Sequence, residues 1–305
     1  MAIASEIHSL EEVNYKFRLG RFFLGIILFF ILIFSFLSYY PFGDKLKDRV
    51  KALTGGACPL DYNEVRFEFF LPKIVIDDLI IPASCMGKEG APLRLTYLNL
   101  GFRLISFSPF GIPFKIETQY NAQPLELFYV LGLGKQTLRM VDQRLVLSRL
   151  DGLMGNFKLG GSIILDALVQ MDMNQKMLAL DIKAKSENFN IPAQNVMQNR
   201  FSLPSLNVRK FYLETNSDNF PNLKVVSFTL GDPDSPVRMD LKGNINVQNP
   251  MNFSSLKLDG ELAFSEQFKQ QFPVGFLVND TFTVKDGFYQ VTLGGTLAAP
   301  ALQPR

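Results

Sequence analysis

The sequence predicts a mainly β protein: an N-terminal transmembrane helix, then a large curved, mostly antiparallel β-sheet domain with a few short helices. The 19 residues from Phe22 to Tyr40 carry no charge, and about 20 apolar residues span a bilayer as a helix. After this run, apolar and polar side chains alternate along most of the chain, which is typical of strands with one apolar face. Asp286-Gly287 separates two alternating runs, which is a strong hairpin signal.

The apolar run divides the chain into four expected parts. Residues 1–21 form a cytosolic tail, 22–41 a transmembrane signal anchor, 42–56 a juxtamembrane helix or linker, and 57–305 the sheet domain. The run is longer than a secretory signal core, and it ends in bulky residues where a signal peptidase requires small ones. Basic residues flank the run on both sides in similar numbers, so charge alone does not decide its orientation.

Composition and motifs argue against an enzyme. The 31 basic and 29 acidic residues are scattered along the chain, so no nucleic-acid partner is expected. His8 is the only histidine and precedes the anchor, which excludes a Ser-His or Cys-His nucleophile and an imidazole zinc site in the sheet domain. Two acidic pairs, Asp77-Asp78 and Asp232 with Asp234, are expected in turns. The sequence therefore predicts no catalytic site, no cofactor and no metal site.

Two cysteines, Cys58 and Cys85, lie near the start of the sheet domain. An even number of cysteines in an oxidising compartment indicates a disulfide. The alternative is a pair of reduced, buried thiols.

Two further elements are expected within the sheet domain. Ser265 to Phe272 predicts a short helix, with serine as the N-cap and Phe268 and Phe272 one turn apart. The spacing of Leu125, Phe128 and Tyr129 predicts a helical insert over residues 124–144, broken near the glycines at 132 and 134.

A glycine-centred pattern occurs four times: apolar, any, apolar, any, Gly, any, apolar. Its central pairs are Leu159 with Gly161, Leu241 with Gly243, Leu258 with Gly260, and Leu293 with Gly295. Because side chains alternate along a strand, each glycine lies on the face of its apolar neighbours. These positions are either bends in a sheet that packs on its own helices, or gaps in an open groove for acyl chains or a partner's apolar segment. The eight residues are the candidate interaction face.

Several of these segments resemble the GspN family, membrane-anchored accessory proteins of bacterial type II secretion systems. The resemblance lies in residues 241–245 (LKGNI), 251–258 (MNFSSLKL), 285–289 (KDGFY) and 293–300 (LGGTLAAP), with 151–161 similar to the central strands of that family. It covers residues 151–305 and the anchor, whereas residues 57–150 match less well and the cysteine pair is not a known feature of the family.

This resemblance implies a single-pass inner-membrane protein with its main domain in the periplasm. It further implies a structural or assembly role through contacts with other secretion subunits, without catalytic residues. The closing segment also resembles AsmA-like repeats, which implies the alternative of a lipid-binding or lipid-transfer module with phospholipid in an apolar β-groove.

Overall fold

The computed structural model divides the chain into two compact units, Met1–Leu53 and Thr54–Arg305. The described residues are 60–68, 73–83, 92–103, 106–107, 110–153, 158–174, 176–196, 201–248 and 253–305, with 28, 29, 32, 45 and 48 in the first unit. Those five are helical. The expected tail, most of the expected anchor and linker, and both cysteines lie outside the described residues. In the described part of the chain, no helix is long and apolar enough to cross a membrane.

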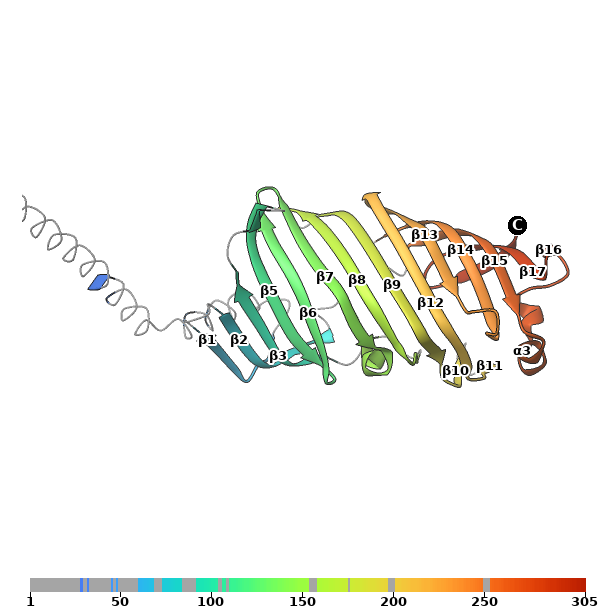
Figure 1. The fold of residues 1–305 in the computed structure, drawn as a ribbon, viewed down its shortest axis with the longest axis horizontal. Helices are drawn as coiled ribbons and strands as arrows, with labels where there is room; N and C mark the ends of the chain where they lie inside the picture. Colours follow the sequence, from blue (N-terminus) through green and yellow to red (C-terminus); the bar gives the residue numbers. More distant parts are fainter. Residues whose placement is uncertain are drawn as a thin grey trace, which may run out of the picture. The chain divides into compact units, whose positions relative to one another are not determined.

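The second unit is built on one 16-stranded sheet in which every neighbouring pair of strands is antiparallel (Figure 1). Its strands are β1 (Glu64–Glu68), β2 (Lys73–Ile81), β3 (Leu93–Phe102), β4 (Ser106–Phe107), β5 (Phe110–Tyr120), β6 (Gln123–Gly132), β7 (Lys135–Val146), β8 (Ser162–Asp172), β9 (Met177–Ile191), β12 (Leu206–Asn219), β13 (Asn222–Leu230), β14 (Val237–Asn246), β15 (Ser255–Phe264), β16 (Val284–Lys285), β17 (Phe288–Gly295) and β18 (Pro300–Pro304). The predicted large antiparallel sheet is therefore confirmed.

Strand order in the sheet follows chain order almost throughout. β4 is a short addition to β5, while β16 and β18 both pair with β17. β10 (Gln194–Val196) and β11 (Phe201–Leu203) form a separate two-stranded sheet. The helices described in the second unit are the 3₁₀ segments η2 (Leu147–Leu153) and η4 (Val274–Phe276) and the helix α3 (Glu266–Gln271).

A buried hydrophobic cluster lies in the C-terminal half of the sheet. Leu241, Leu258 and Val291 from β14, β15 and β17 are at most 6% exposed, and they share one cluster with Phe268 and Phe272. The Ser265 hydroxyl accepts a hydrogen bond from the Phe268 backbone N–H and begins α3. The predicted serine-capped helix is confirmed, and it holds two phenylalanine rings within this cluster.

The predicted helical insert over 124–144 is wrong. These residues form most of β6 and β7, which pair as a hairpin. The paired residues run from Phe128 opposite Arg139 to Leu131 opposite Gln136. Leu125, Leu127 and Tyr129 also alternate, and pairing with β5 on the other side of β6 selects the strand. The predicted hairpin at Asp286-Gly287 is confirmed: it links β16 to β17, and both residues have positive φ angles, as a tight hairpin turn requires.

Candidate functional site: the apolar face of the sheet

The register of the strands aligns apolar side chains into two rows on one face of the sheet. The first, called the middle row, crosses β3 to β9 and consists of Phe102, Phe114, Tyr129, Leu138, Val169 and Leu180. The second, called the C-terminal row, crosses β8 to β18 and consists of Ala167, Ile182, Thr215, Val225, Gly243, Leu258, Leu293 and Leu302. Ala167 lies two residues from Val169 in β8, so the two rows belong to the same face.

The middle row is only partly covered. Phe102 is 40% exposed, Phe114, Tyr129, Leu138 and Val169 are half-buried, and Leu180 is buried. The aromatic members contact one another, with ring centroids 5.0 Å apart for Phe102 and Phe114 and 5.8 Å apart for Phe114 and Tyr129. The Tyr129 hydroxyl donates to the Gln136 side chain at 2.9 Å. This part of the sheet presents a continuous, half-exposed apolar strip.

Charged side chains lie on the opposite face of the same strands. The Lys115 ammonium lies 2.6 Å from the Glu117 carboxylate and 2.9 Å from the Glu126 carboxylate. The hydrogen bond to Lys115 lowers the pKa of Glu117, and the bonds to the two carboxylates raise the pKa of Lys115. Asp166 and Lys183 are cross-strand neighbours further along this face. The middle strands are therefore amphipathic, with one charged and one apolar face.

The apolar face is closed in its C-terminal part. Val225 and Leu258 of the C-terminal row are 2% and 6% exposed, and Leu241 is 1% exposed. They belong to the cluster that contains the side chains of α3 and of the segment that follows it, including Val278. The predicted residues Leu159 and Leu293 pack against the same cluster. Leu241 and Leu258 are therefore buried within this cluster, and the partly buried Leu159 and Leu293 pack against it.

The predicted glycines lie where strands approach closely. Gly243 pairs with Leu258, and Gly260 pairs with Leu241. A Cβ atom at Gly243 would lie 2.1 Å from the Lys257 carbonyl oxygen, and one at Gly260 would lie 1.9 Å from the Asp240 carbonyl oxygen. Backbone of the adjacent strand occupies the space beside each glycine. Gly161 precedes β8 and Gly295 ends β17.

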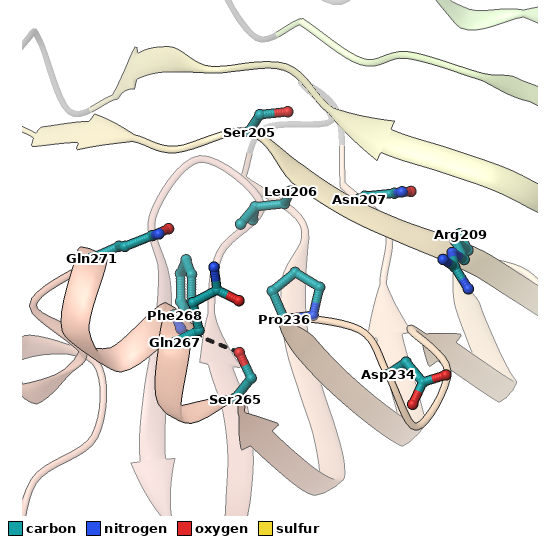
Figure 2. A pocket seen from close by; sticks show the side chains of 10 residues that line it. All are labelled: Ser205, Leu206, Asn207, Arg209, Asp234, Pro236, Ser265, Gln267, Phe268 and Gln271. Carbon is teal, nitrogen blue, oxygen red and sulfur yellow. Dashed lines mark hydrogen bonds between the residues drawn. The ribbon is translucent and has the colours of Figure 1, made fainter.

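A hollow of about 290 Å³ lies between the start of β12 and the N-terminus of α3 (Figure 2). Phe268 and Leu206 are its buried apolar members. Most of the other lining residues are polar or charged: Ser205, Asn207, Arg209, Asp234, Ser265, Gln267 and Gln271. A second hollow of about 450 Å³ is lined by charged residues that include Arg139, Asp166, Lys183 and Glu214. Leu168, Ile182 and Val226 also line the second hollow. The polar lining of the first hollow does not resemble the apolar walls that an acyl chain requires.

The acidic pairs are held by local contacts. The Asp232 carboxylate accepts hydrogen bonds from the Ser235 hydroxyl at 2.8 Å and the Asp234 backbone N–H at 3.1 Å, and the bond from Ser235 lowers its pKa. The turn predicted for Asp232 and Asp234 is confirmed. Asp77 instead lies within β2, in an ion pair with Arg66 at 2.6 Å. Within the described ranges, no three His, Cys, Asp or Glu side chains are grouped so that they could hold a metal ion.

The middle row was not predicted from the sequence. Its signal was present, because Leu125, Leu127, Tyr129 and Leu131 alternate with other residues along β6. The glycine-centred pattern instead predicted an interaction face that includes β14, β15 and β17, where the apolar face of the sheet is covered.

Comparisons with known proteins assign no relative to this chain. No family model matches it, no curated protein matches it, and no solved structure matches it.

Proposed function

We propose that this protein binds the acyl chains of lipids along the apolar face of β3 to β9. One observation carries the proposal: the middle row is continuous across six strands, yet most of its members are only half-buried. Large contiguous apolar surfaces on soluble domains are characteristic of ligand or partner sites.

The chemistry of the strip suits an acyl chain better than a polar ligand. Each methylene removed from water contributes about 0.8 kcal/mol, so a chain lying across several strands gains affinity without directional contacts. The aromatic contacts among Phe102, Phe114 and Tyr129 provide a flat apolar surface for it.

The sequence resemblance supports a second proposal: a membrane-anchored periplasmic component of a type II secretion system, bound to other secretion subunits. Most of the described residues that resemble the GspN family lie in β14, β15 and β17, which are consecutive neighbours in the sheet.

Addition of a partner strand at the edges of the sheet is disfavoured. Pro300 and Pro304 lie in the edge strand β18, where proline has no N–H to donate. Edge strand β1 carries exposed Glu64 and Arg66, and charges on an edge oppose pairing. A protein partner would therefore bind the apolar strip.

Photo-crosslinking in living cells tests both proposals on the full chain. p-Benzoylphenylalanine replaces either Tyr129, on the apolar face, or the adjacent Phe128. Phe128 is a matched control because it faces the other way: it pairs with Lys115 and Arg139, and the Arg103 guanidinium lies 5.3 Å from its ring centroid. Cells grown with ³²P-phosphate are irradiated, and the purified chain is examined for labelled lipid.

The first proposal expects a labelled phospholipid adduct at Tyr129 and background labelling at Phe128. Equal labelling at both positions, or none at either, contradicts it. A protein adduct of defined mass at Tyr129 without lipid label supports the second proposal instead.

A further inference from the structure

The two ends of the middle strands differ in chemistry. At the end where β3 finishes and β5 begins, which is the upper end in Figure 1, six large apolar side chains are strongly exposed. They are Phe102 (40%), Phe110 (57%), Ile112 (49%), Leu133 (87%), Met173 (54%) and Leu178 (36%). We call this set the apolar rim. At the opposite end, the β5–β6 turn is Asn121-Ala122.

Two members of the apolar rim lie at the tips of hairpins. Leu133 lies in the two-residue turn between β6 and β7, and Met173 lies in the turn between β8 and β9. The register places both turns at one end of the sheet, because Lys135 of β7 pairs with Asp172 of β8. Turns can carry polar residues at no structural cost, so an exposed leucine at a tip indicates a surface it contacts.

Basic residues accompany the rim. Lys135 follows the Leu133 turn, Lys176 follows the Met173 turn, and Arg103 follows Phe102; all three are exposed. Asp172 is the acidic residue of these two turns, and its carboxylate accepts hydrogen bonds from the backbone N–H groups of Asn174 and Lys176. Apolar side chains flanked by cations match an anionic membrane surface, where the former enter the headgroup region and the latter bind phosphate.

We propose that the apolar rim docks the sheet domain onto a bilayer containing anionic phospholipid. The inference rests on the proposed lipid-binding function and adds an entry point to it. The middle row begins at the rim with Phe102, which pairs with Phe114, so an acyl chain leaving the bilayer meets the apolar strip directly.

The chain contains no tryptophan, which allows a single-tryptophan test. Leu133→Trp places a reporter at the rim, and Ala193→Trp places the matched control at an exposed position near the opposite end. Each full-length variant is reconstituted into phosphatidylethanolamine–phosphatidylglycerol vesicles whose acyl chains are brominated, because bromine quenches tryptophan on contact. A third variant combines Leu133→Trp with Lys135→Glu and Lys176→Glu.

We expect Trp emission from the Leu133 variant to shift to shorter wavelength and lose most of its intensity, whereas the Ala193 variant keeps its emission. The two charge reversals should restore much of the lost emission. Equal quenching at the two positions, or none at either, overturns the proposal. This test can fail without the first proposal failing. If lipid crosslinks at Tyr129 but the tryptophan at position 133 is not quenched, the lipid-binding strip is retained and only this entry point is rejected.

Discussion

The middle and C-terminal parts of the sheet have the same strand pattern but a different covering. In β14 and β15, Leu241 and Leu258 are buried in a cluster with Phe268 of α3 and with Phe272, which directly follows α3. In β6 and β7, Tyr129 and Leu138 occupy equivalent positions on the same face and are only half-buried. The comparison shows that an alternating strand provides an apolar face, and that the segments packed over this face decide whether it becomes core or stays partly exposed.

The largest expected effect comes from deleting a side chain in each part. Leu241→Ala should lower the free energy of unfolding by about 2–5 kcal/mol, since the cavity lies in a closed core. Leu138→Ala removes the same atoms from the half-exposed middle row and should cost less than about 2 kcal/mol. Urea unfolding of the full-length variants measures both. Equal losses would mean that the middle face is as closed as the C-terminal part.

Two glycines sharpen the comparison within the C-terminal part. Gly260→Ala forces a Cβ atom to within 1.9 Å of the Asp240 carbonyl oxygen, so we expect a loss of roughly 3 kcal/mol from overpacking. The control is Gly294→Ala in β17, where the nearest atom would be 3.9 Å away and the change should stay within about 0.5 kcal/mol. A bulky residue at Gly243 would likewise meet the backbone of β15 and push β14 and β15 apart, so it would not fill an open groove. Thermal unfolding that ranks the variants the other way would contradict this assignment.

The smallest effect concerns the charged face of the middle strands. Glu117 has a lowered pKa in the folded chain, so its pairing with Lys115 stabilises the fold above the ordinary carboxyl pKa of 4.5. That stabilisation is lost as the pH falls through the lowered value. Lys115→Met should therefore cost under about 1 kcal/mol at neutral pH, because both side chains are partly solvated, and the cost should shrink below pH 4.5. Urea unfolding of wild type and variant across pH measures the difference, and a cost that is constant down to strong acid would contradict it.

Local signals were predictable where they agreed with one another. β14 follows from alternation over Val237, Met239 and Leu241, α3 from its serine cap, and the β16–β17 hairpin from Asp286-Gly287. Residues 124–144 were misjudged because Leu125, Phe128 and Tyr129 satisfy helical spacing as well as alternation. Pairing of β6 with β5 across the Asn121-Ala122 turn decided between the two, and such pairing is not encoded in the spacing of one segment.

The sequence by itself determined that the strands have one apolar and one charged face, because side-chain alternation is a property of each strand alone. It also determined the serine cap of α3 and the hairpin turn at Asp286-Gly287. Only the tertiary structure decided which part of the apolar face is covered. The cover comes from Phe268 and Phe272 of a segment beyond β15, and whether that segment packs over β14 or β6 depends on strand order and register, not on local pattern.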